Sequence, residues 1–308
     1  MVYKKGWVPI NSVPTMVRTW GGWIDEEIKT KEVLLLITGN PGISDFYMKF
    51  LSMLHFILQI PVWIVCHAGH QLPPDDCGLK MPPLKKNTNL YTLQGQVDHK
   101  KWFINKYIPK DKNIYLIGHS VGGKVVVELL KDEQINEQIT QAHLLFPTLE
   151  HFDDTHNAWL LKNVTLRILF ILNFVSWLLY KLPYHIRFCL VRTVYFLRLN
   201  FSMPTCAIHG IVKLISPQVI KQAIFLAHDE MLRIKDLDHD VYETNKNKIW
   251  IYYGQKDGWT EPHHFENMRL HHPEVNAQML DSKFAHIFTF QTNYEMAEVL
   301  CRVIKSNS

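Results

Sequence analysis

Short apolar runs alternate with segments of helical periodicity along the first half of the chain. The apolar runs that we interpret as buried strands are Glu32–Ile37, Pro61–Val65, Ile114–Ile117 and Ala142–Phe146. The segments between them with helical spacing are Phe46–Leu58, Tyr91–Ile108 and a stretch beginning at Gly123. Strands that alternate with helices predict an α/β fold, with a mostly parallel sheet and crossover helices.

This alternation breaks near residue 151 and returns later in the chain. Two further strands are predicted at Lys248–Gly254 and Asn276–Leu280, and a final helix at Tyr294–Ile304. We therefore expect an α/β core that is interrupted by an inserted helical cap. The expected divisions are 1–150 for the first part of the core, 151–245 for the cap and 246–308 for the second part of the core.

The expected cap contains an apolar segment that carries no acidic residue from Val164 to Phe201. Its longest uncharged run, Ile168–Tyr180, is 13 residues long, whereas a bilayer-spanning helix needs about 20. We therefore predict no transmembrane helix. Leucines and aromatic residues mixed with arginines suit a helix or hairpin lying in a membrane interface. The alternative is a helical cap whose apolar faces pack on the core.

Composition narrows the class of protein. The 308 residues are 47% hydrophobic and 20% charged, with a net charge of +4, and no dense Lys/Arg stripe indicates nucleic-acid binding. The five cysteines are widely spaced and form no CxxC, so neither a disulfide framework nor a metal site is predicted. The N-terminus lacks the apolar region of a signal peptide, and we expect a reducing, cytosol-facing location.

A Gly-His-Ser-Val-Gly sequence stands between a predicted strand and a predicted helix. A serine in this turn, Ser120, would project its hydroxyl above the sheet, and Gly118 and Gly122 leave room for the turn. The backbone N–H of Val121 would point toward a developing oxyanion. This setting favours a nucleophile over the alternative, a glycine-rich turn with a passive serine.

A nucleophilic serine needs a base, and the base needs an orienting acid. Asp257 follows the strand in Lys248–Gly254, and His286 lies in a loop after the next strand. The order Ser, Asp, His is that of α/β-hydrolases. Asp281 is a weaker candidate for the acid, and we interpret His119 as a packing or hydrogen-bonding residue rather than the base.

A second oxyanion donor is expected after the first core strand, where the chain reads Ile-Thr-Gly-Asn-Pro-Gly. Asn40 would supply its backbone N–H from the turn made by Gly39 and Pro41. The alternative is an ordinary Asn-Pro-Gly turn.

Several motifs together resemble those of the lipid droplet-associated hydrolase family. They are GNPG (39–42), PVW (61–63), HAGH (67–70), GQ (95–96), HK (99–100), GHS (118–120), LFPT (145–148), YYG with D-x-W (252–259) and HIF (286–288). The resemblance covers about residues 33 to 300. It implies an α/β-hydrolase fold, with the catalytic triad at Ser120, Asp257 and His286 and no metal or organic cofactor. One departure is Thr38, where many α/β-hydrolases have a histidine before the glycine.

The resemblance also implies a location and a substrate. The family is attached to lipid droplets and to the cytosolic face of the endoplasmic reticulum, and its implied activity is hydrolysis of neutral-lipid esters, including sterol esters. A hairpin from Ile168 to Leu199 would then dip into the lipid monolayer. The side chains expected to contact lipid are Ile168, Leu169, Phe170, Phe174, Trp177, Leu178, Leu179, Phe188, Tyr195 and Phe196.

Two other functions fit the same residues. The protein could act mainly as an adaptor at the droplet surface with a weak or vestigial triad. It could also transfer acyl groups or hydrolyse thioesters with the same triad, because the sequence does not distinguish water from another acceptor.

Overall fold

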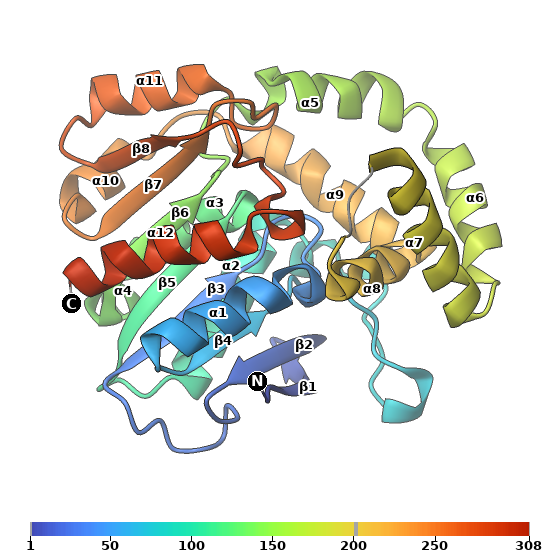
Figure 1. Cartoon of the computed structure of the whole chain (residues 1–308), viewed down its shortest axis with the longest axis horizontal. Coiled ribbons are helices and arrows are strands. Elements are labelled where there is room, and N and C mark those ends of the chain that lie inside the picture. The colour runs from blue at the N-terminus through green and yellow to red at the C-terminus, as the bar shows by residue number, and fades with distance from the viewer. Residues whose placement is uncertain (1, 200–202, 308) are drawn as a thin grey trace.

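A twisted sheet runs through the middle of the computed structural model, which describes residues 2–199 and 203–307, without the side chains of residues 198 and 199 (Figure 1). Its strands are β1 (Lys4–Ile10), β2 (Val13–Trp20), β3 (Glu32–Ile37), β4 (Val62–Val65), β5 (Asn113–His119), β6 (Ile139–Leu145), β7 (Ile249–Gly254) and β8 (Asn276–Leu280). In the described residues their order is β1-β2-β4-β3-β5-β6-β7-β8. The strands β3 to β8 run parallel to one another, and β2 pairs antiparallel with both β1 and β4.

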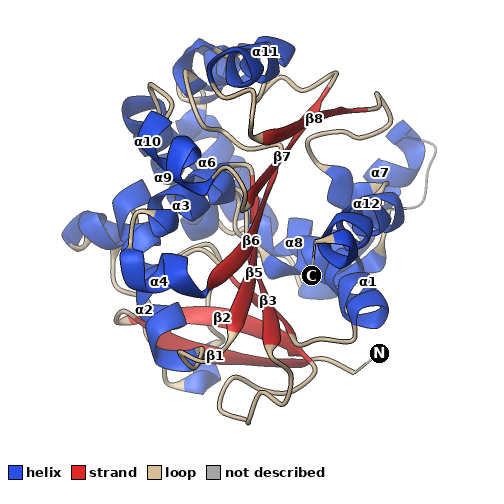
Figure 2. Ribbon diagram, turned by 90° about the vertical axis from the view of Figure 1, so that its left-hand side faces the viewer, coloured by secondary structure: helices blue, strands red, loops and turns tan. Residues whose placement is uncertain are grey.

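Helices cover both faces of the sheet (Figure 2). They are α1 (Met48–Leu58), α2 (Leu93–Tyr107), α3 (Val121–Leu130), α4 (Glu133–Gln138), α5 (His156–Leu160), α6 (Leu169–Tyr180), α7 (Tyr184–Leu199), α8 (Thr205–Leu214), α9 (Pro217–Arg233), α10 (His239–Asn245), α11 (Pro262–His271) and α12 (Asn293–Ser306). The helices α1 and α12 pack together on one face, and α2, α3 and α10 lie on the other. This is the predicted α/β architecture.

The central strand β3 shows why both faces must be covered. Its side chains are fully buried from Val33 to Ile37. Because alternate residues of a strand point to opposite faces, Val33, Leu35 and Ile37 join one apolar core, and Leu34 and Leu36 join the other. A strand that is apolar on both sides is typical of a parallel sheet between two helical layers.

The chain between β6 and β7 forms the helices α5 to α10. The helices α5 to α9 lie toward the carboxyl ends of the central strands, whereas α10 packs against α3 (Figure 1). Within the described residues, no single helix is long and apolar enough to cross a membrane. Two sharply bent helix pairs meet the length and composition for a crossing only when taken together, and they are His156–Thr165 with Leu169–Tyr180 and Thr205–Leu214 with Pro217–Arg233.

The structure adds elements that the sequence pattern did not predict. β1 and β2 form a hairpin whose two turn residues, Asn11 and Ser12, both have positive φ, as a tight two-residue hairpin turn requires.

Helix α3 begins at Val121, two residues before the predicted start at Gly123. The earlier start matters for the site, because it makes Ser120 the residue that immediately precedes the helix.

Candidate active site

Ser120 occupies a strained turn between β5 and α3. Its φ of 54° and ψ of −125° are unusual for a residue with a side chain. The turn is close-packed, since a Cβ atom on Gly118 would lie 2.4 Å from the Gly122 carbonyl oxygen, and one on Gly122 would lie 2.4 Å from that of Ile37. Both glycines are therefore needed for the turn. This is the strand–turn–helix geometry expected for a nucleophile elbow.

The side chains of Ser120, His286 and Asp257 form a hydrogen-bonded line. His286 Nε2 lies 3.0 Å from Ser120 Oγ, and His286 Nδ1 lies 2.6 Å from Asp257 Oδ2. Because the Asp257 carboxylate accepts a hydrogen bond from the Nδ1–H group, the neutral ring presents Nε2 as an acceptor for the serine hydroxyl. The three residues predicted from sequence order are thus brought together in an arrangement able to deprotonate Ser120.

Asp257 is held as a carboxylate by its surroundings. Burial acts to raise its pKa, but His286 and hydrogen bonds from Trp259 and Thr260 outweigh burial and hold the pKa below its ordinary value. The Thr260 hydroxyl donates to Oδ2 at 2.8 Å, and the backbone N–H groups of Trp259 and Thr260 donate to Oδ1 at 2.8 and 3.2 Å. Sequence reasoning missed Thr260, although an Asp followed by N–H donors two and three residues later is a common turn arrangement. The other candidate acid, Asp281, lies at the surface with a side chain 80% exposed.

His119 precedes the nucleophile in the chain, but its two ring nitrogens hydrogen-bond to other groups. Its Nδ1 is 2.7 Å from the Tyr47 hydroxyl, and its Nε2 is 2.9 Å from the carbonyl oxygen of His286. Burial lowers the pKa of His119 to about 3, and the neighbouring His286 acts in the same direction. The ring is therefore neutral and serves as a hydrogen-bonding bridge.

The two predicted oxyanion donors flank Ser120. Val121 is the first residue of α3, and its backbone N–H has no acceptor within the helix. Asn40 lines the same cavity as Ser120 and is anchored by its side chain, whose Nδ2 donates to the Ala223 carbonyl oxygen at 2.8 Å and to Glu230 Oε1 at 3.1 Å. The preceding residue is fixed as well, since the Gly39 N–H donates to the Tyr47 hydroxyl at 2.9 Å.

A cavity of about 360 Å³ opens onto Ser120 and His286. Its wall is mostly apolar and includes Phe46, Phe152, Ile211, Leu214 and Phe290. Glu230 of α9 also lines it, a residue that sequence reasoning did not select. Across the described residues, no group of three or more His, Cys, Asp or Glu side chains is arranged to hold a metal ion.

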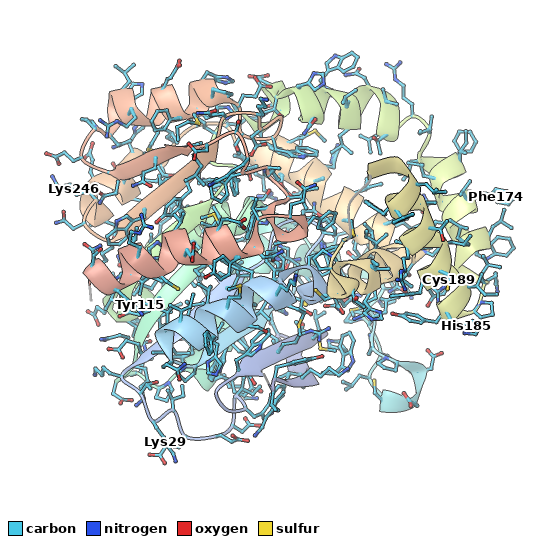
Figure 3. The ribbon with its side chains drawn as sticks, viewed as in Figure 1. Lys29, Tyr115, Phe174, His185, Cys189 and Lys246 are labelled. Atoms are coloured by element: carbon cyan, nitrogen blue, oxygen red, sulfur yellow. The ribbon has the colours of Figure 1, made fainter. Side chains whose placement is uncertain are left out.

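The side chains expected to contact lipid divide into two sets. The exposed set is Ile168, Phe170, Phe174, Trp177, Leu178 and Phe196. Figure 3 shows Phe174 pointing outward from α6, and His185 and Cys189 at the outer edge of α7. The half-buried set is Leu169, Leu179, Phe188 and Tyr195. The side chain of Leu199, at the end of the expected hairpin, lies outside the described part of the chain.

Two of the half-buried residues have contacts within the protein. The Phe188 ring lies 4.9 Å from that of His209, and Tyr195 lines the cavity of Ser120. The hairpin of α6 and α7 therefore has an inner side that contributes to the cavity and an outer side that exposes large apolar groups. An exposed apolar patch of this kind marks an interaction surface.

Residues 30–289 match the model of a family described as lipid-droplet associated hydrolase. The chain is 35% identical over 306 residues to the lipid droplet-associated hydrolase of Drosophila melanogaster, covering 99% of both chains. It is 29% identical to the human protein of the same name, covering 95% of this chain and 92% of that one. Among solved structures, a carboxylesterase from the thaumarchaeon Nitrososphaera gargenis superposes with a TM-score of 0.64 at 14% identity, covering 99% and 98% of the two chains.

Proposed function

Because the chain belongs to the lipid droplet-associated hydrolase family, we propose that it hydrolyses neutral-lipid esters at the surface of lipid droplets through a Ser120–His286–Asp257 triad. The observation that carries the proposal is the hydrogen-bonded line of these three side chains, with separations of 3.0 and 2.6 Å. The names of the relatives support the location at lipid droplets, and the geometry of the three side chains supports ester hydrolysis.

The triad performs two successive acyl transfers. His286 Nε2 takes the proton of the Ser120 hydroxyl as Oγ attacks the ester carbonyl, and a tetrahedral intermediate forms. When this intermediate collapses, His286 returns the proton to the departing alcohol, and an acyl-enzyme remains on Ser120. Water then attacks the acyl carbon, gives its proton to His286 and releases the carboxylic acid. Asp257 holds the ring in the correct tautomer throughout.

The oxyanion of each tetrahedral intermediate is stabilised by the backbone N–H groups of Val121 and Asn40. Preorganised donors are effective because they need no reorientation as charge develops. The N-terminus of α3 adds its partial positive charge at the same point. The bonds that anchor the side chain of Asn40 and the backbone of Gly39 support a preformed position for the second donor.

The apolar wall of the cavity suits the acyl chain or the alcohol portion of a lipid ester. Aromatic and branched side chains exclude water and bind hydrocarbon without selecting a charge. Sterol esters belong to this class, and we include them in the proposed substrates.

The outer side of the α6–α7 hairpin is proposed to lie in the lipid monolayer of the droplet or of the cytosolic face of the endoplasmic reticulum. Phe170 is 73% exposed and Phe196 is 66% exposed, and residues 164–201 carry no acidic group. Such a surface binds a lipid interface through its apolar area. Since Tyr195 of α7 also lines the cavity, this placement would bring the cavity close to the lipid.

The substrate can be tested by supplying purified protein with emulsions of sterol ester or triacylglycerol in a phospholipid monolayer. We expect fatty acid release by the wild type and none by Ser120→Ala. If both proteins bind the emulsion and neither releases fatty acid, the hydrolase proposal is wrong and the adaptor function is favoured.

A further inference from the structure

Glu230 is a buried acid in the cavity of the proposed nucleophile. It lies on α9, is only 2% exposed and lines the cavity together with Ser120 and His286. It is the one carboxyl group that the described part of the chain contributes to the cavity wall. The proposed triad already contains its acid, Asp257, so Glu230 is not required for that role.

The two carboxyl oxygens of Glu230 have different surroundings. Oε1 accepts a hydrogen bond of 3.1 Å from the Asn40 side chain, which belongs to the loop of the proposed second oxyanion donor. Oε2 has no hydrogen-bond partner among the described residues and is not among the fully enclosed polar atoms. From its lack of a protein partner and from the position of Glu230 in the cavity wall, we infer that this second oxygen faces the cavity interior.

The environment favours the protonated form of Glu230. Burial raises its pKa to about 8, the hydrogen bond from Asn40 opposes this shift, and the neighbouring carboxylate of Asp229 adds to it. Asp229 forms an ion pair with Arg233, with 2.9 Å between Asp229 Oδ1 and Arg233 Nε. The other ionisable side chains in the cavity wall are Tyr47, His119, Tyr195 and His286. None of these is an Arg or Lys that would hold a carboxylate at Glu230.

We propose that Glu230 is a specificity residue whose protonated carboxyl group holds the Asn40 loop through Oε1 and donates a hydrogen bond from Oε2 to an uncharged oxygen of the ester substrate. The proposal rests on the proposed function and narrows its substrate class to uncharged esters. The un-ionised state of Glu230 also favours catalysis, since a carboxylate beside Asn40 would repel the oxyanion of the tetrahedral intermediate. Ionisation of Glu230 therefore lowers activity at alkaline pH.

The experiment measures kcat and KM for p-nitrophenyl butyrate, a substrate without an ionisable group, from pH 6 to 9.5. We expect wild-type kcat/KM to fall above about pH 8, the pKa of Glu230. In Glu230→Gln the fall is absent, because the amide keeps a donor and an acceptor but cannot ionise. In Glu230→Leu at pH 7, loss of the hydrogen-bond donor raises KM by about tenfold. Glu230→Gln keeps a donor, so its KM should stay close to that of the wild type.

The matched control is Glu150→Gln. Glu150 is also buried, at 3% exposure, and burial raises its pKa as well, but it accepts from Asn267 and does not line the cavity. The alkaline fall should persist in this variant. The proposal is overturned if the fall persists in Glu230→Gln, or if Glu230→Leu binds the ester with the wild-type KM. Activity that survives Ser120→Ala would instead contradict the proposed function, so the two failures are distinguishable.

Discussion

The ring of His119 holds the backbone of His286, since its Nε2 donates a hydrogen bond of 2.9 Å to the His286 carbonyl oxygen. The other ring nitrogen, Nδ1, accepts from the Tyr47 hydroxyl at 2.7 Å. The same hydroxyl accepts from the Gly39 N–H at 2.9 Å. One chain of hydrogen bonds thus connects the proposed oxyanion loop to the proposed general base. Neither His119 nor Tyr47 forms a hydrogen bond to the Ser120 hydroxyl in this chain.

The first prediction concerns Tyr47. In Tyr47→Phe, the Gly39 N–H loses its acceptor and His119 loses its donor, so we expect kcat to fall about tenfold, the effect of roughly one buried hydrogen bond. KM should change less, because the cavity wall keeps its shape. The control is Tyr242→Phe, which removes a buried hydroxyl that has no partner in the described structure. Equal loss of kcat in both variants would mean that the chain through His119 has no positioning role.

The second prediction separates the two candidate acids. Asp257→Asn replaces the group that holds His286 in the required tautomer, and we expect kcat to fall by about three to four orders of magnitude. Asp281→Asn should retain wild-type kcat, since Asp281 lies at the surface. Steady-state kinetics on a soluble ester measure both. A large loss in the Asp281 variant with little loss in the Asp257 variant would reverse the assignment.

Local patterns predict some parts of this fold better than others. The apolar run at Glu32–Ile37 coincides with β3, because a buried parallel strand is continuously apolar. The predicted strand at Asn276–Leu280 coincides with β8, an edge strand in which exposed Asn276 and Gln278 alternate with the less exposed Ala277 and Met279. The hairpin of β1 and β2 was missed, since its turn is Asn11-Ser12 rather than a glycine-containing pair.

The site shows the same division. Ser120, Asp257 and His286 were predicted from chain order, because each follows a predicted strand of the sheet. Tyr47 and Glu230 could not be predicted, since they come from a short 3₁₀ helix after β3 and from α9. These side chains reach the site because of how the two helices pack on the sheet, and this packing cannot be predicted from the local spacing of residues in the sequence.

The third prediction concerns lipid binding by α6. The double variant Phe174→Glu/Trp177→Glu places two charges on side chains that are 59% and 48% exposed. We expect binding to phospholipid-coated droplets to fall more than about tenfold, because charged groups are costly at an apolar interface. Flotation with purified droplets measures the bound fraction. Unchanged flotation would contradict the placement of the hairpin in the monolayer.

A matched control for this experiment lies elsewhere on the surface. Leu232 on α9 and Leu270 on α11 are 62% and 75% exposed, and both lie outside the α6–α7 hairpin. The double variant Leu232→Glu/Leu270→Glu adds the same charge and should bind droplets like the wild type.

The fourth prediction concerns pH and stability. His67, His70, His99 and Lys100 are buried together, and Lys100 Nζ lies 3.5 Å from His67 Nδ1 and 3.1 Å from His99 Nδ1. Burial, and then the neighbouring Lys100, lower the pKa values of the three histidines, that of His70 to about 3. Burial lowers the pKa of Lys100 to about 7.

The sign of the effect follows from proton binding. Below its ordinary pKa of 6.5, each of these histidines is protonated in the unfolded chain while the folded chain keeps it neutral. The unfolded state therefore binds more protons, and stability falls as the pH falls, by about 1.4 kcal/mol per pH unit for each proton difference. For Lys100, stability rises with pH between about pH 7, its pKa in the folded chain, and pH 10.5, its ordinary pKa.

Urea unfolding of wild type and Lys100→Met between pH 7 and 9 measures this contribution. We expect the free energy of unfolding to rise with pH in the wild type and to rise less steeply in Lys100→Met. Lys101→Met is the control, because Lys101 on the same helix is part-exposed and pairs with Asp132 at 3.1 Å, and it should keep the wild-type slope. Identical slopes in wild type and Lys100→Met would show that Lys100 is not buried in neutral form.

Covalent labelling by a fluorophosphonate tests the assignment of Ser120 most directly, since the probe reacts only with a serine whose hydroxyl is activated by a base. The control is Ser282→Ala, because Ser282 is an exposed serine in the loop after β8. Wild type and Ser282→Ala should label equally, and mass spectrometry should place the probe on Ser120. Ser120→Ala should remain folded and fail to label. Labelling that persists in Ser120→Ala, or a folded wild type that does not label at all, would contradict the proposed mechanism.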